Sequence, residues 1–204
     1  MNQTTWFLAS AVLLTATATA FSAPYVPNPF DVTQPGDPVI PLPSDFSPLD
    51  QDASNAIDNA LGGDFFKYGS LFGPGAGLEI DAANDIVPVT SLWIYTANND
   101  PDDTSMDPSS FTLEGTNNGV DYTMIAQGPL SLPSGRNNDS TTDFHQVVTF
   151  TSNTTAYDSY RLLFPTVVGN GPLHIGEIEL VPEPSSVVLL GIAVVGLFVR
   201  HRRK

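Results

Sequence analysis

Residues 111–127 read FTLEGTNNGVDYTMIAQ, and they indicate the fold class most clearly. Apolar Phe111 and Leu113 alternate with Thr112 and Glu114, which is the period of a half-buried strand. Asn-Gly then stands between two alternating runs, where both residues tolerate positive φ. The segment therefore predicts a β-hairpin with strands at 111–116 and 122–127.

The rest of the central region shows the same short alternating runs. They predict strands at 78–80, 87–97, 145–150, 160–165 and 174–181. No segment of this region keeps a 3.6-residue apolar period for more than a turn or two, and 53–61 is the best candidate for a short helix. Short strands separated by polar, Gly- and Pro-rich turns are typical of a β-sandwich, so the chain is predicted to be all-β over residues 50–181.

The N-terminal region reads as an export signal followed by a linker. Residues 6–14 are apolar, and small residues with the pattern Ala18-x-Ala20 follow. This arrangement predicts a signal peptide over residues 1–20, although only the α-amino group is charged before Trp6. Residues 21–49 contain prolines 24, 27, 29, 35, 38, 41, 43 and 48, which predict an extended, Pro-rich leader.

The C-terminal region, residues 182–204, has three parts. Pro182-Glu183-Pro184 ends the preceding strand, residues 187–199 carry no charge, and a basic cluster follows at Arg200, Arg202, Arg203 and Lys204. The apolar run predicts a transmembrane helix, although it is shorter than the roughly 20 residues of a full span. A buried core helix is the alternative, but it would not need four cations at its end.

The order of these three parts resembles the PEP-CTERM sorting signal of Gram-negative bacteria. The resemblance implies recognition by an exosortase, a membrane transpeptidase that cuts near the Pro-Glu-Pro motif. The protein would be anchored in the inner membrane before processing, and would then reach the cell surface or the extracellular matrix.

Composition narrows the classes of partner. The chain has no cysteine, which excludes disulfides and thiolate chemistry. All 22 acidic residues precede the apolar run, where only Lys67, Arg136 and Arg161 oppose them, so this part carries three minus 22, or −19. Such a charge excludes nucleic acid as a partner and suits solubility, divalent cations or neutral sugars.

Several runs in the central region resemble galactose-binding-like domains of the discoidin, F5/8 type C-like group. These runs are residues 94–101, 107–119, 157–166 and 175–180, and the resemblance extends over roughly residues 52–180. It implies a jelly-roll sandwich of about eight strands with ligands bound by loops at one end.

The same resemblance implies a structural calcium ion between the first loop and the last strand. Its side-chain ligands would be Asp58, Asp64 and Glu177, and calcium takes six to eight such oxygens. The alternative is that Asp58 caps a turn and that Glu177 pairs with Lys67 or Arg161.

Two polar loops are candidates for ligand binding. One contains Asn98, Asn99 and Asp100, and the other contains Arg136 and Asn137. Amides, a guanidinium and carboxylates can hydrogen-bond sugar hydroxyls. The alternatives are a solvated turn for the first loop and a flexible segment for the second.

Catalysis finds no support in the sequence. His145 and His174 lie in predicted strands, and His201 lies in the tail. The chain has neither a G-x-S-x-G nor an H-E-x-x-H pattern. The sequence therefore predicts a non-enzymatic, exported binding module, with extracellular polysaccharide as its ligand. The alternative is a structural matrix or surface protein with no small ligand.

Overall fold

The computed structural model describes residues 20–21, 25–43, 47–62, 67–82, 87–98, 103–139, 141–150 and 152–182. Within them the chain forms strands and one 3₁₀ helix, η1, at Ala53–Ala56. The strands are β1 (Ala20–Phe21), β2 (Val39–Leu42), β3 (Tyr68–Ser70), β4 (Ala76–Asp81), β5 (Val89–Tyr95), β6 (Ser110–Thr116), β7 (Thr123–Pro129), β8 (Asp143–Thr149), β9 (Ser159–Phe164), β10 (Leu173–Ile175) and β11 (Glu177–Pro182).

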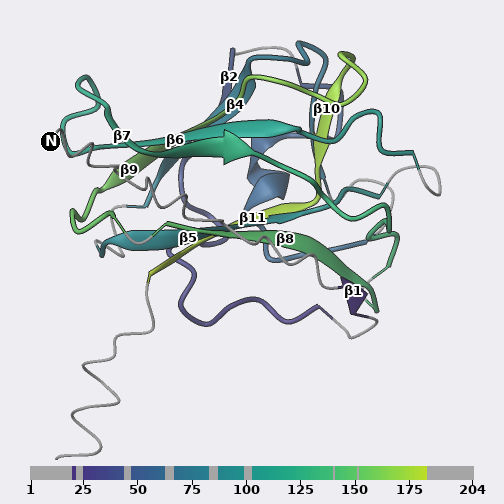
Figure 1. The fold of residues 1–204 in the computed structure, drawn as a ribbon, viewed down its shortest axis with the longest axis horizontal. Coiled ribbons are helices and arrows are strands. Elements are labelled where there is room, and N and C mark those ends of the chain that lie inside the picture. Colours follow the sequence, from purple (N-terminus) through teal and green to yellow (C-terminus); the bar gives the residue numbers. More distant parts are fainter. Residues whose placement is uncertain are drawn as a thin grey trace, which may run out of the picture.

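The strands form two facing layers. A five-stranded sheet has the order β2-β4-β9-β6-β7, and a four-stranded sheet has the order β1-β8-β5-β11. A two-stranded sheet of β10 and β3 lies at one end. The strand pairings among the described residues are antiparallel, and Figure 1 shows η1 between the layers. The predicted all-β sandwich is confirmed.

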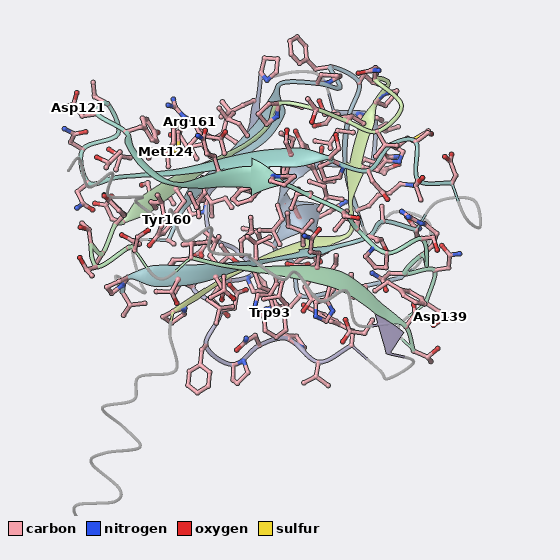
Figure 2. All side chains as sticks on the ribbon, in the orientation of Figure 1. Trp93, Asp121, Met124, Asp139, Tyr160 and Arg161 are labelled. Carbon is pink, nitrogen blue, oxygen red and sulfur yellow. The ribbon has the colours of Figure 1, made fainter. Side chains whose placement is uncertain are left out.

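Alternating side chains fill the space between the layers. Leu92 and Ile94 of β5 face Leu113 of β6 and Leu162 of β9 across a core in which all four are fully buried. The outward residue Trp93 is only partly buried, as the period-two pattern predicts. Figure 2 shows Trp93 on the outer side of the four-stranded sheet and Tyr160 between the layers.

The β6–β7 hairpin forms where the sequence predicted it. Gly119 has a φ of +68°, and the Asn118 side chain organises the turn. Its Oδ1 accepts hydrogen bonds from the backbone N–H of Val120 at 3.0 Å and of Asp121 at 2.8 Å. An asparagine that bonds its own turn in this way is a common device for reversing the chain.

We expect Asn118→Ala to lower the free energy of unfolding by about 1–2 kcal/mol, because two turn N–H groups lose their acceptor. Chemical unfolding measures the change. Asn138→Ala, at an exposed position of a different loop, serves as the control and should leave stability within about 0.5 kcal/mol of the wild type.

The Pro-rich segment 21–49 contributes to the sandwich. Its β2 is the edge strand of the five-stranded sheet and pairs with β4, with Ile40 opposite Glu79. The predicted helix at 53–61 is the shorter η1, and the predicted strand at 174–181 is divided into β10 and β11 at Gly176.

The predicted signal peptide lies outside the described residues except for Ala20, and the predicted transmembrane helix lies wholly outside them. Within the described part of the chain, no helix has the length and apolar character that crossing a membrane requires. The boundaries of the four predicted segments stay predictions.

Candidate functional site

Arg136 and Asp107 form a buried ion pair in the loops at one end of the sandwich. The guanidinium donates from Nη1 to Asp107 Oδ1 at 2.6 Å and from Nη2 to Oδ2 at 2.8 Å. It also donates to the carbonyls of Pro133 and Ser134. Only 1% of the Arg136 side chain and 3% of the Asp107 side chain are exposed. Burial raises the pKa of Asp107, and the hydrogen bonds from Arg136 oppose that shift.

Asn137 is also buried and bonded within the protein. Its Nδ2 donates to the carbonyls of Thr96 and Phe144, each at 2.9 Å, and its Oδ1 accepts from Phe144 N–H at 2.8 Å. The sequence predicted Arg136 and Asn137 as ligand contacts. The structure places both in the interior, where Arg136 joins the loop to Asp107 and Asn137 joins it to Thr96 and Phe144.

Lys67, Asn98 and His174 come together at the same end of the sandwich. Lys67 Nζ donates to the Asn98 carbonyl at 2.9 Å, although only 8% of Lys67 is exposed. His174 lies on β10, and burial, together with nearby Lys67, lowers its pKa to about 4. Asp103 lies within electrostatic range of His174, and hydrogen bonds from Ser105 lower the pKa of its carboxyl. We call Lys67, Asn98, Asp103 and His174 the polar end.

The polar end brings together a neutral imidazole, an amide, a largely buried ammonium group and a solvent-accessible carboxylate. These groups can donate to and accept from neutral hydroxyl groups. Asn98 is the one predicted ligand residue that the structure places here, since Asn99 and Asp100 lie outside the described residues. The sequence did not indicate that Lys67 and His174 lie together, because Lys67 precedes β3, His174 lies on β10, and the two share no local motif.

We expect stability to depend on pH through His174. Its folded-state pKa lies below that of the unfolded chain, so the unfolded chain binds the proton more readily between about pH 4 and 6.5. Its contribution is therefore complete above this window and is lost as the pH falls through it. Between pH 7 and pH 4, the free energy of unfolding should fall by about 2 kcal/mol more in the wild type than in His174→Gln. Urea unfolding at the two pH values measures both changes. If both proteins lost the same free energy of unfolding, His174 would not be the group whose titration lowers stability.

A second group of interest is the buried carboxylate of Glu177 on β11. Glu177 is 0% exposed, and neither of its oxygens accepts a hydrogen bond. Burial raises its pKa well above the ordinary value, and nearby Asp58, Asp31 and Glu179 raise it further. Burial also raises the pKa of Asp58, whose Oδ1 accepts from Ala60 N–H at 2.9 Å. Asp58 thus caps its turn, and Arg161 pairs with Glu114 rather than with Glu177.

This arrangement fits a cation such as calcium in charge and in donor type. Both Glu177 oxygens are buried without a hydrogen bond of good geometry, and Asp58 lies close enough to raise the pKa of Glu177. Within the described residues, no three Asp, Glu or His side chains are placed to hold a metal ion together. A cation bound by Asp58 and Glu177 would therefore need further oxygens, and Asp64, the third predicted ligand, lies outside the described residues.

Two further buried carboxylates lie close to Glu177 and were not predicted. Glu179 is 0% exposed and Asp31 is 4% exposed. Burial raises the pKa of Glu179, and it raises the pKa of Asp31 to about 8. The alternation Glu177-Ile178-Glu179-Leu180 was the available signal for Glu179, because it places both carboxylates on the face opposite the apolar core.

Comparison with known proteins gives two kinds of match. Residues 180–204 match the PEP-CTERM protein-sorting motif. The curated proteins contain no match to this chain.

Among solved structures, a family 32 carbohydrate-binding module (CBM) from C. perfringens NanJ in complex with galactose is similar, with a TM-score of 0.55 and 16% identity, over 74% of this chain and 97% of that one. The lectin domain of lectinolysin, complexed with Lewis B antigen, has a TM-score of 0.52 and 16% identity, over 74% of this chain and 94% of that one. Chitosan-binding module 1 from a chitosanase/glucanase of Paenibacillus sp. IK-5 has a TM-score of 0.52 and 13% identity, over 74% of this chain and 98% of that one. At such low identity these likenesses show the fold alone. The chain therefore has the β-sandwich fold of these carbohydrate-binding modules, and it carries a PEP-CTERM protein-sorting motif at residues 180–204.

Proposed function

We propose that the protein is exported, sorted through its C-terminal motif, and binds carbohydrate through its sandwich without catalysing a reaction. The observation that carries this proposal is the presence, in one chain, of a sorting motif and a sandwich similar to solved carbohydrate-binding modules. Fold alone does not assign function, so the chemistry of the polar end is the second support.

The sorting steps follow from the motif. A signal peptide over residues 1–20 would direct export, and the apolar run at 187–199 would hold the chain in the inner membrane. An exosortase would then cut near Pro182-Glu183-Pro184, and the domain would reach the cell surface or extracellular matrix of a Gram-negative host. Mass spectrometry of the mature C-terminus tests this, since an uncut tail on surface-located protein would contradict it.

Neutral polysaccharide is the class of ligand that the domain suits best. The strongly acidic surface repels polyanions, whereas neutral sugars carry no charge to be repelled. Lys67, Asn98, Asp103 and His174 supply donors and acceptors close together.

A calcium ion on Asp58 and Glu177 would supply positive charge that joins the first loop to the last strand, and its role would be structural.

Titration of residues 24–184 against a glycan panel and the host's own exopolysaccharide tests this ligand class. We expect saturable binding that Asn98→Ala weakens about tenfold, the effect of losing one well-placed polar contact. Asn117→Ala is the matched control, because Asn117 lies in the hairpin turn and its side chain bonds to Ala156 and Asp158. Figure 2 shows Asp121 at the opposite end of the sandwich from Asp139. A flat titration across the panel would contradict the proposal.

A structural matrix or surface protein without a small ligand is the second candidate. One observation favours it: Arg136 and Asn137, two of the predicted ligand residues, use their polar groups inside the protein. This candidate predicts retention in a surface fraction together with no affinity for any glycan.

A further inference from the structure

One end of the sandwich, which we call the hairpin end, consists of the β6–β7 turn, the loop between β8 and β9, and the start of β5. The Asn117 side chain joins the turn to the loop, because its Nδ2 donates to the Ala156 carbonyl at 3.2 Å and its Oδ1 accepts from Asp158 N–H at 2.9 Å. Asn153 Nδ2 donates to the Val89 carbonyl at 2.9 Å, which joins the loop to β5. The three segments therefore form one continuous surface.

The last strand ends at the hairpin end. Pro182, the first residue of the Pro-Glu-Pro motif, is the last residue of β11 and lies opposite Val89. At the other end of the same strand pair, Glu177 lies opposite Tyr95, which precedes Asn98 of the polar end by three residues. The five residue steps from Glu177 to Pro182 span about 17 Å of strand. The chain therefore leaves the sandwich at the end opposite to the polar end.

A short stretch of sequence links the hairpin end to the apolar run. Residues 183–186, which we call the tether, are all that separates Pro182 from residues 187–199. Even a fully extended chain covers no more than about 18 Å in these five residue steps. The headgroup layer alone occupies about 5–8 Å on each side of a bilayer. When the apolar run lies in the membrane, the hairpin end is therefore held close to the lipid surface.

The charge of the domain decides how it stands on such a short tether. Before the apolar run, acidic residues outnumber basic ones by 22 to three, so anionic headgroups repel the domain. A domain that lay on its side would bring a whole sheet close to the headgroups, whereas a domain that stands on one end keeps most of its charge away. The hairpin end also carries the exposed apolar side chains of Val120 and Val87, which are 78% and 38% exposed.

We propose that the uncut chain stands upright on the membrane, with the hairpin end against the lipid headgroups and the polar end directed away from them. The tether holds the hairpin end there, because residues 81–89, 116–123 and 150–158 contain no lysine or arginine that would attract anionic lipid. The sorting motif then lies in the narrow space between the sandwich and the membrane. The inference rests on the proposed anchoring by residues 187–199 and does not depend on carbohydrate binding or on a cation.

Site-specific labelling tests this orientation, because the chain has no cysteine of its own. Val120→Cys places a fluorophore at the hairpin end, and Asn138→Cys places the same fluorophore at an exposed position of the other end. Figure 2 shows the neighbouring residues Asp121 and Asp139 at opposite ends of the sandwich.

Each labelled chain, from residue 21 to residue 204, is reconstituted into vesicles of phosphatidylcholine and phosphatidylglycerol. A second set of vesicles also contains lipid with a nitroxide quencher on its headgroup. We expect the fluorophore at position 120 to lose most of its fluorescence in the vesicles with quencher. The fluorophore at position 138 should be equally bright in both sets, because the upright domain holds it away from the headgroups.

Flotation of the vesicles separates failure of the orientation from failure of the anchoring. If the chain does not float with the vesicles, residues 187–199 do not anchor it, and both the anchoring and the orientation are overturned. If the chain floats but position 120 is quenched no more than position 138, the upright orientation is overturned while the anchoring stands.

A variant of the apolar run tests the role of the tether. Leu190→Asp combined with Val194→Asp places two charges in this run, and should release the chain from the vesicles and restore the fluorescence at position 120. Quenching that survived the loss of the anchor would mean that the hairpin end binds lipid by itself, and would overturn the role of the tether.

Discussion

Asp107→Ala should lower the free energy of unfolding by about 3–5 kcal/mol, because it leaves the buried Arg136 guanidinium without its counter-charge. Two carbonyls, those of Pro133 and Ser134, would remain as acceptors, but neither carries a full negative charge. A loss of this size is a large fraction of the 5–15 kcal/mol that stabilises a typical domain. Chemical unfolding at neutral pH measures it.

Two variants show whether the loss comes from the unpaired charge. Arg161→Ala removes the pair with Glu114, in which 31% of the arginine side chain is exposed, and should cost no more than about 1 kcal/mol. Asp107→Leu combined with Arg136→Met removes both charges and should recover most of the loss. If the double variant is as unstable as Asp107→Ala, the unpaired guanidinium is not the cause.

The different outcomes at Arg136 and at the hairpin show which kinds of information a sequence carries. The hairpin could be predicted because its signals are local: the alternation and the Asn-Gly turn all fall within residues 111–127. The partner of Arg136 lies 29 residues earlier, in a loop whose composition does not indicate where its side chains point. A polar loop therefore predicted a ligand contact where the structure has an internal ion pair.

The docking of residues 25–33 on β11 and the formation of β2 could not be predicted from the sequence, for a related reason. Prolines at 29, 35, 38, 41 and 43 disrupt any visible period, and β2 includes Pro41. Proline is tolerated there because β2 is an edge strand, which pairs on one side only. Asp31 bonds to Leu180, 149 residues away, so only the folded chain reveals that the leader and the last strand form one unit.

Glu177→Gln should change stability differently in the presence and absence of calcium. Without calcium, the substitution replaces a buried carboxylate that has no hydrogen-bond donor by a neutral amide of the same shape, so stability should stay equal or rise. With calcium at 100 to 1,000 times its dissociation constant, the wild type should gain about 3–4 kcal/mol, because the ion binds the folded state alone. The variant should gain little, because it has lost a charged ligand.

The calcium-dependent shift in melting temperature measures this difference. Glu79→Gln on β4 is the matched control, since it neutralises a partly buried strand carboxylate on the five-stranded sheet and should keep the full calcium response. Because no hydrogen-bond donor stabilises Glu177, its replacement should cost no stability without calcium and should show its effect only when calcium is present. A carboxylate retained only for folding would make Glu177→Gln destabilising in both buffers, and an equal calcium response in variant and wild type would remove Glu177 from the cation site.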